Sequence, residues 1–124
     1  FIVSHAPSMV QRAGEIALEN GDVQVQELVS QFKERSQFCY DALQTMNGVS
    51  VSRPEGAFYL FPRVEGVDDS FAFALELLKT TQVSVAPGVA FGNGGEGAIR
   101  ICTAADMSVL EPAMERLDHF LAGR

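Results

Sequence analysis

The feature that most constrains this sequence is a glycine-rich segment between two short apolar stretches near the C-terminus. Residues 83–85 (Val-Ser-Val) run into Pro87-Gly88, and five glycines fall between positions 88 and 97. Residues 98–102 (Ala-Ile-Arg-Ile-Cys) then alternate in a way that predicts a strand. Because side chains along a strand alternate between faces, Ile99 and Ile101 share one face, and Arg100 lies on the other.

Arg100 has two interpretations on this pattern. A guanidinium on a strand is a planar fork of donors that matches a carboxylate or a phosphate with two parallel hydrogen bonds. The alternative is a solvated arginine on the exposed face of an antiparallel strand. The small neighbours Ala98 and Cys102, and the glycine-rich loop before them, favour anion binding without deciding the question.

Residues 83–104 closely resemble the C-terminal domain of the class I and II aminotransferases, the fold type I enzymes that depend on pyridoxal phosphate. The family pattern there is a strand, Pro-Gly, a small residue with Phe-Gly, a Gly-Glu-Gly turn and an apolar-Arg-apolar strand. This chain has Pro87-Gly88, Ala90-Phe91-Gly92, Gly95-Glu96-Gly97 and Ile99-Arg100-Ile101. Residues 54–62 (Pro-Glu-Gly-Ala-Phe-Tyr-Leu-Phe-Pro) match a second family motif, Pro-x-Gly-(Gly/Ala)-Phe-Tyr, in the family order. The resemblance covers essentially the whole chain.

The resemblance implies a function for the intact protein. It would move an amino group between an amino acid and a 2-oxo acid with pyridoxal phosphate, as a homodimer, and Arg100 would bind the substrate α-carboxylate. Phe58 would help to form a wall near the substrate entrance, although a core aromatic on a strand needs no further role. Related decarboxylases, synthases and lyases share this fold, so transamination is the first expectation among several reactions.

The chain lacks the cofactor lysine that the resemblance calls for. In the family this Schiff-base lysine sits in a Ser-x-Ser-Lys or Ser-x-x-Lys turn, whereas the two lysines here, Lys33 and Lys79, follow Phe32 and Leu78. The segments that carry the Asp and Tyr facing the cofactor ring are also missing. The chain therefore resembles the C-terminal third of an aminotransferase without its large domain. We expect no catalytic residue in it, unknown cofactor-binding residues, and no activity from the chain alone.

A second hypothesis is a non-enzymatic module that binds or senses a small acid through Arg100 and the glycine-rich loop. Aminotransferase-like domains also occur attached to transcription regulators, so a regulatory role is open. The coding sequence before Phe1 would discriminate: a large domain with a lysine turn favours the enzyme, and a winged-helix segment favours the regulator. The first residue is not Met and the chain opens on three apolar residues, which is typical of a piece of something larger, although a removed tag or a processing event would also explain this start.

Composition excludes several other functions. The net charge of −7 argues against nucleic acid as a partner, because phosphate binding needs clustered Lys and Arg. No apolar run approaches the roughly 20 residues of a membrane span, and the N-terminus lacks the basic flank of a signal peptide. Cys39 and Cys102 lie outside any Cys-x-x-Cys spacing, and two free, buried cysteines suit a reducing cytoplasm.

Neither of the two histidines is a strong candidate for a metal-binding or catalytic role. With only His5 and His119 and no cluster that combines histidines with acidic residues, a catalytic metal site is not expected. His119 fits the last turns of a helix, where a cation is favoured by the helix dipole. Where residues 4–8 read Ser-His-Ala-Pro-Ser, the family has a Ser/Thr-Asn-Pro-Ser-like stretch directed towards the partner subunit, so a cross-subunit role for Ser4 or His5 is a hypothesis on a diverged motif.

The order of predicted elements is helix, helix, strand, strand, helix, strand, strand, helix. It favours an α+β fold, a small and mostly antiparallel sheet with helices packed on it. By resemblance, residues 1–21 end the large cofactor-binding domain, 22–48 form a long connecting helix, and 49–124 form the small C-terminal domain.

The periodicity also gives details of these elements. The long helix has an apolar stripe expected to pack on the core: Val25, Leu28, Val29, Phe32, Cys39, Leu43 and Met46. Strands 49–52 and 57–61 are candidates for a hairpin. A helix capped by residues 68–70 follows, and residues 108–111 have capping-box spacing before a last helix in which Pro112 fits only near the first turn.

Overall fold

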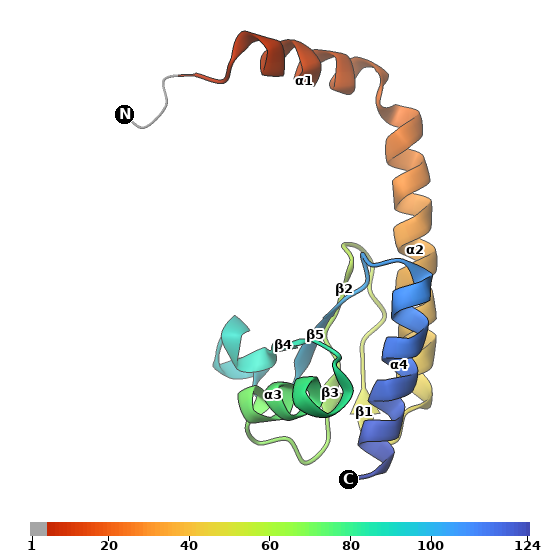
Figure 1. The fold of residues 1–124 in the computed structure, drawn as a ribbon, viewed down its shortest axis with the longest axis vertical. Coiled ribbons are helices and arrows are strands. Elements are labelled where there is room, and N and C mark those ends of the chain that lie inside the picture. The colour runs from red at the N-terminus through yellow and green to blue at the C-terminus, as the bar shows by residue number, and fades with distance from the viewer. Residues whose placement is uncertain (1–4) are drawn as a thin grey trace. The chain divides into compact units, whose positions relative to one another are not determined.

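The computed structural model describes residues 5–124, so Ser4 lies outside the described residues. The chain divides into two compact units, the first ending at Gln31 and the second running from Phe32 to Arg124. Helix α2 (Asp22–Thr45) begins in the first unit and ends in the second. Figure 1 labels the helices and strands of both units.

The first unit contains α1 (Ser8–Asn20) and the opening turns of α2. Pro7 precedes the first residue of α1, where its fixed φ and missing N–H do no harm, and Gly21 ends the helix. A Cβ at Gly21 would lie 2.4 Å from the Ala17 carbonyl oxygen, so this close turn requires glycine. No residue of α1 is buried, and its exposed apolar side chains are Met9, Val10, Ile16 and Leu18.

Helix α2 is confirmed as one long helix, but its apolar stripe is buried only in part. From Ser36 onwards the stripe enters the core of the second unit, with Cys39 and Leu43 fully buried. Val25, Leu28 and Val29 are exposed. The expectation that the whole stripe packs on the core is therefore wrong for its first half.

All strand pairs of the second unit are antiparallel, where a mostly antiparallel sheet was expected. β1 (Val49–Ser50) pairs with β3 (Arg63–Val64), and β2 (Tyr59–Leu60) pairs with β5 (Ile99–Cys102), which also pairs with β4 (Ala86–Pro87). The predicted hairpin between 49–52 and 57–61 is wrong. β2 pairs with β5 instead, which places the buried side chains of Leu60 and Ile101 opposite each other on one face.

The strand predicted at 83–85 begins later than expected. Helix α3 (Ser70–Thr81) ends at Gln82, which has a left-handed φ of 62° and donates its N–H to the Leu78 carbonyl. Ladder pairing starts only at Ala86. Pro87 can occupy β4 because this strand lies at the edge of its sheet, where a missing N–H breaks no ladder.

The last two helices complete the unit. Asp69 caps α3 by accepting the Ala72 N–H at 2.9 Å, as predicted from the acidic residues there. α4 (Met107–Ala122) starts earlier than the capping-box spacing predicted, because Asp106 is its N-cap residue. Pro112 is therefore the sixth helical residue, and no N–H at that position donates back to the preceding turn.

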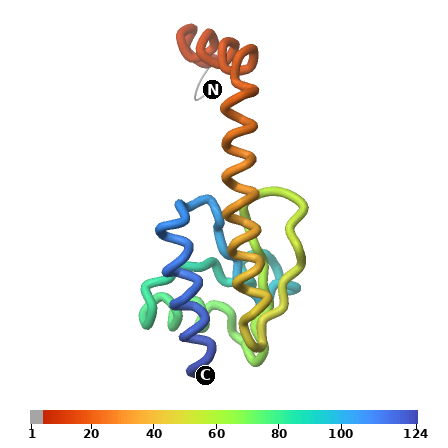
Figure 2. The backbone as a smooth tube through the Cα atoms, turned by 90° about the vertical axis from the view of Figure 1, so that its right-hand side faces the viewer, coloured from red at the N-terminus to blue at the C-terminus, as the bar shows by residue number. Residues whose placement is uncertain are grey.

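The core of the second unit is built from buried side chains of its two small sheets and its helices. In Figures 1 and 2, α4 runs beside the C-terminal half of α2. The buried side chains from these helices, from α3 and from the strands form one cluster that includes Cys39, Leu43, Leu60, Leu77, Ile99, Ile101, Leu110, Met114 and Leu117. The α+β class is confirmed. Among residues 5–124, no helix has the length and apolarity needed to cross a membrane.

Candidate functional site

Arg100 lies on β5 as the sequence predicts. Ile99 and Ile101 are buried at 1% and 5% exposure, whereas Arg100 is half-buried on the opposite face. The strand therefore anchors its apolar side chains in the core and directs the guanidinium away from it.

Two aromatic rings contact the Arg100 guanidinium. The guanidinium carbon lies over the Tyr59 ring and over the Phe91 ring, 4.3 Å from each centroid. Tyr59 is directly opposite Cys102 in the β2–β5 pair, so it shares a face with Arg100. We call Tyr59 and Phe91 the aromatic seat. A cation over a ring face is attracted by the ring quadrupole, so the seat holds the guanidinium by its faces and not by its N–H groups.

The polar edge of Arg100 has no partner among residues 5–124, and this distinguishes it from the other arginines. Its N–H groups make no hydrogen bond or ion pair with any described residue. The six other arginines each donate to an oxygen atom: Arg12, Arg35, Arg53, Arg63, Arg116 and Arg124. A guanidinium seated on rings with its donors unused is suited to bind a planar anion such as a carboxylate.

The glycine loop, residues 88–97, carries one half of the seat. It folds into two 3₁₀ turns, η1 (Gly88–Phe91) and η2 (Asn93–Gly95). Gly88 and Gly95 meet backbone to backbone: a Cβ on Gly88 would lie 2.0 Å from the Gly95 carbonyl oxygen, and one on Gly95 would lie 2.1 Å from that of Gly88. Because neither glycine has a side chain, the backbone at the start of the loop can pack directly against the backbone near its end.

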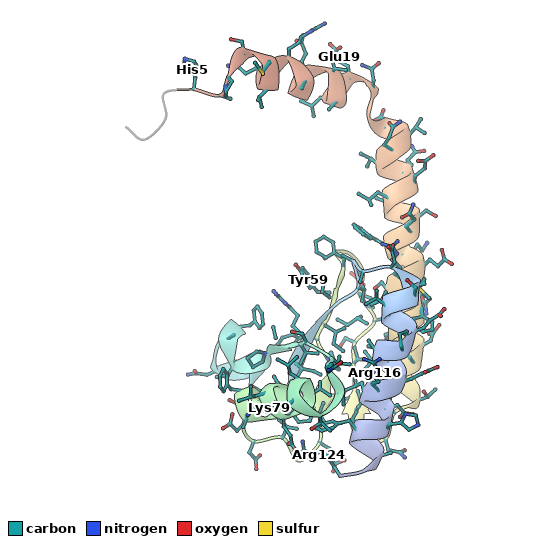
Figure 3. The ribbon with its side chains drawn as sticks, viewed as in Figure 1. His5, Glu19, Tyr59, Lys79, Arg116 and Arg124 are labelled. Atoms are coloured by element: carbon teal, nitrogen blue, oxygen red, sulfur yellow. The ribbon has the colours of Figure 1, made fainter. Side chains whose placement is uncertain are left out.

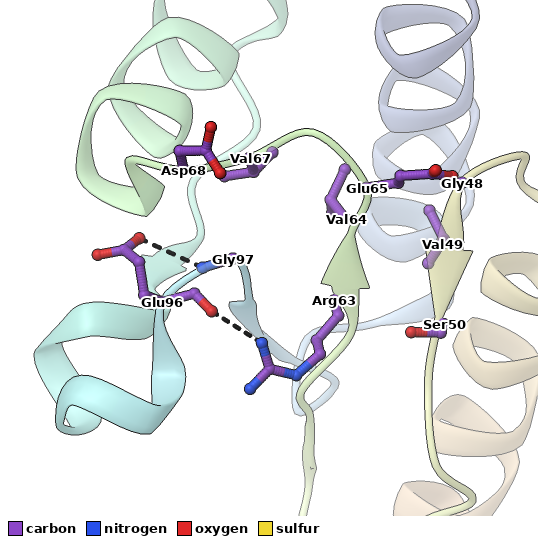
Figure 4. Close-up of a pocket in the computed structure, with 10 residues that line it drawn as sticks. All are labelled: Gly48, Val49, Ser50, Arg63, Val64, Glu65, Val67, Asp68, Glu96 and Gly97. Atoms are coloured by element: carbon purple, nitrogen blue, oxygen red, sulfur yellow. Dashed lines mark hydrogen bonds between the residues drawn. The ribbon is translucent and has the colours of Figure 1, made fainter.

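Three residues, Arg63, Ser70 and Glu96, hold the glycine loop against the rest of the unit, and we call them the loop latch. The Glu96 carboxylate accepts the backbone N–H of Ser70 at 2.6 Å, at the start of α3. Arg63 donates to the Glu96 carbonyl at 2.8 Å (Figure 4). The Ser70 hydroxyl accepts the N–H of Val89 in the loop at 3.1 Å. Hydrogen bonds from the backbone and side chain of Ser70 lower the pKa of Glu96, so the latch favours its ionised form.

Comparison with known proteins agrees with these features. The model of the family "Aminotransferase class I and II" matches residues 1–117. The chain belongs to the class I and II aminotransferase family. It is 36% identical to an aspartate aminotransferase of Pyrococcus horikoshii over 99% of this chain and 32% of that protein. It is 37% identical to a probable N-acetyl-LL-diaminopimelate aminotransferase of Bacillus subtilis over 98% of this chain and 31% of that protein.

Solved structures of aminotransferases have the same fold. One is a Methanococcus jannaschii protein described as similar in its active site to kynurenine aminotransferases, with a TM-score of 0.85 and 31% identity over 94% of this chain and 31% of that chain. Another is the aspartate aminotransferase of Thermotoga maritima, with a TM-score of 0.81 and 37% identity over 96% of this chain and 30% of that chain. The chain thus spans about a third of the length of the curated relatives it matches.

Phe58 contacts one member of the aromatic seat, Tyr59. It is half-buried, with its ring 5.3 Å from that of Phe32 and 4.6 Å from that of Tyr59, measured between centroids. Its carbonyl accepts the Thr103 N–H at 2.8 Å, which ties the residue before β2 to the end of β5. Phe58 therefore packs on Tyr59. Among the described residues, its own ring makes no cation–π contact with Arg100.

The lysines and cysteines of the chain, all of which lie within residues 5–124, show no cofactor or metal site. Lys33 is exposed on α2, and Lys79 is exposed in the last turn of α3 (Figure 3). Both cysteines are free, but only Cys39 is buried, so the expectation that both are buried is wrong for Cys102. No group of three or more His, Cys, Asp or Glu side chains in residues 5–124 is placed to hold a metal ion.

An open groove of about 640 Å³ is lined in part by two residues of the loop latch, Arg63 and Glu96. Its lining includes Arg63, Glu65, Asp68 and Glu96 (Figure 4). Arg63 is engaged with loop carbonyls, so the cationic group in this groove is not available to an anion.

The sequence singled out Arg100 as a candidate, but neither the aromatic seat nor the loop latch was predicted from it. Tyr59, Phe91 and Glu96 all lie within the matched motifs, so the signal was present. The missing information was the register, because only the pairing of Tyr59 with Cys102 shows that the two motifs meet at one guanidinium.

Proposed function

We propose that this chain is the C-terminal part of a pyridoxal-phosphate-dependent aminotransferase in which Arg100 binds the α-carboxylate of the substrate. The observation that supports the proposal is the free, seated guanidinium of Arg100, the one arginine without a polar partner among the described residues. A transaminase uses an amino acid and a 2-oxo acid in turn, and an α-carboxylate is the group they share. One arginine can therefore bind both.

The binding of the carboxylate by Arg100 would serve orientation as well as affinity. Two parallel N–H···O bonds fix both the position and the plane of the carboxylate, and hence the direction of the bonds at the α-carbon. A hydrogen bond to a charged group contributes about 1.5–3 kcal/mol. Phe58, whose ring lies 4.6 Å from that of Tyr59 between centroids, would support the Tyr59 side of the wall.

The residues of this chain do not fit a site for pyridoxal phosphate. Lys33 and Lys79 are exposed on helices, and neither lies near Arg100 in the sheet. The cofactor would be held by a part of the protein outside these 124 residues. The domain division at residues 21 and 48, the homodimer and the inactivity of the isolated chain belong to the same proposal.

The first test is to read the coding sequence upstream of Phe1 and to assay the full-length product. We expect a preceding domain with a lysine turn, and amino-group transfer between an amino acid and a 2-oxo acid that requires added pyridoxal phosphate. A start codon directly before Phe1, or a winged-helix segment upstream, would contradict the enzyme and favour the acid-binding module or the regulator.

The second test uses the substrate carboxylate itself. The full-length protein and its Arg100→Gln variant are compared on an amino acid and on the amine that lacks only the α-carboxylate. We expect Arg100→Gln to lower kcat/KM for the amino acid about tenfold to a hundredfold and to leave the amine unchanged. An equal loss with both substrates would show that Arg100 does not read the carboxylate.

A further inference from the structure

We propose that Phe91 is a positioning residue for Arg100, and that the loop latch keeps it in place. This inference rests on the proposed carboxylate-binding role of Arg100. It concerns a residue that does not touch the carboxylate and acts only through the guanidinium.

The first step of the argument is the freedom of the arginine side chain. Arginine has a long, flexible side chain, and ordering it when a ligand binds would reduce affinity. Arg100 has no hydrogen bond or ion pair to any residue in the described range 5–124 that would order it beforehand. The contacts that order it are the two rings, each 4.3 Å from the guanidinium carbon. Because the two rings contact the face of the guanidinium, its N–H groups at the edge are left to donate to a ligand.

The second step is that the two rings differ in how they are supported. Tyr59 is part of β2 and is fixed by its register with Cys102. Phe91 lies at the end of η1 in the glycine loop and is 48% exposed. Its ring packs edge-on against Phe61 at 5.8 Å between centroids. The position of Phe91 therefore depends on the loop, and that of Tyr59 on the sheet.

The third step is that the loop is held from its base. The Gly88–Gly95 crossing closes it, and the Glu96 carboxylate and Ser70 hydroxyl tie it to the start of α3. Arg63 donates to the carbonyls of Gly94 and Glu96. None of these groups makes a hydrogen bond or ion pair with Arg100 in the described part of the chain. Their effect on the guanidinium runs through Phe91, which makes Phe91 the residue to test.

The test is steady-state kinetics of the full-length enzyme with Phe91→Leu, Phe91→Tyr, Arg100→Lys and the double variant Phe91→Leu/Arg100→Lys. Phe91→Leu keeps an apolar side chain but removes the ring face. We expect KM for the amino acid, and the inhibition constant of propionate, to rise about threefold to tenfold, with a smaller change in kcat. Phe91→Tyr keeps the ring face and should restore both values.

The matched control is Phe71→Leu, the same substitution at a phenylalanine of α3 that is 61% exposed. It should change neither constant. In the double variant, Phe91→Leu should add little to the loss caused by Arg100→Lys, because a residue that acts through Arg100 has nothing left to position.

The outcomes separate the two proposals. If Arg100→Lys leaves KM and the propionate constant unchanged, the proposed function fails and this inference fails with it. If Arg100→Lys raises them but Phe91→Leu behaves like Phe71→Leu, the inference alone is overturned. It is also overturned if the losses from Phe91→Leu and Arg100→Lys simply multiply, or if Phe91→Tyr does not restore binding.

Discussion

Helix α2 contains two leucines of one apolar stripe in very different surroundings. Leu28 is 48% exposed, in the unit that ends at Gln31, whereas Leu43 has no exposed surface and lies in the core of the second unit. Both belong to the same periodic pattern in the sequence. The difference teaches that an amphipathic stripe predicts a face suited to apolar contact, but not which partner covers it.

The largest expected effect is on stability and compares these two leucines directly. In the 124-residue chain, Leu43→Ala should lower the free energy of unfolding by about 2–5 kcal/mol, because it removes buried methyl groups and leaves a cavity. Leu28→Ala should change it by at most about 0.5 kcal/mol, as is usual for an exposed position. Denaturant unfolding followed by circular dichroism measures both. Equal losses would mean that the first half of the stripe is packed in solution and would break the comparison.

The second expectation sharpens the comparison with thiol chemistry. Burial raises the pKa of Cys39 to about 11, so at pH 8 only about one molecule in a thousand carries the reactive thiolate. A cysteine introduced as Leu28→Cys, and the native Cys102, are exposed. Both should react with a maleimide far faster than Cys39. In denaturant the three should react alike, which serves as the control.

The same burial predicts a dependence on alkaline pH. Folding raises the pKa of Cys39. Between the ordinary thiol pKa and this raised value, the Cys39 thiol is therefore protonated in the folded chain and ionised in the unfolded chain. Stability should therefore fall as the pH rises above the ordinary thiol pKa, and Cys39→Ser should flatten that fall. Rapid labelling of Cys39 in the folded chain would contradict the burial of the second half of α2.

The smallest expected effect is on the melting temperature, and it compares the carboxylate of Glu15 in the first unit with that of Glu96 in the second. Glu15 pairs with Arg12 on the surface of α1, where an exposed ion pair contributes little, so Glu15→Gln should leave the melting temperature unchanged. Glu96 latches the glycine loop, and folding lowers its pKa. Its ionised form therefore stabilises the fold above its ordinary pKa, and this contribution is lost as the pH falls through the folded value.

Melting curves of both variants across neutral and acidic pH test this contrast. Glu96→Gln should lower the melting temperature at pH 7, by less than Leu43→Ala does, and the gap to the parent chain should close in acid. A gap that stays constant with pH would show that the Glu96 charge does not hold the loop.

The sequence predicted most of the fold where the signal was local. The long helix α2, the cap at Asp69 and the alternation around Arg100 all follow from neighbouring residues, and the structure confirms them. The motif match also identified the family, which the comparisons confirm. These features need no knowledge of how distant segments pair.

The features that the sequence did not predict depend on contacts between distant segments. The partner of β1 is β3 and not the strand of residues 57–61, and the choice depends on which pairing buries Leu60 against Ile101. The aromatic seat joins Tyr59 and Phe91 across two motifs, and the latch joins Glu96 to Ser70 across 26 positions. No local period carries such information.

The most direct test of the central claim, that Arg100 binds the substrate carboxylate, is Arg100→Lys in the full-length enzyme. Lysine keeps the positive charge but loses the planar fork, so one of two directed bonds is lost. We expect kcat/KM to fall about tenfold to a hundredfold for every amino-acid substrate, since all share the α-carboxylate, with little change in melting temperature. Wild-type kcat/KM, or a protein that no longer folds, would instead make Arg100 a structural residue and contradict the account.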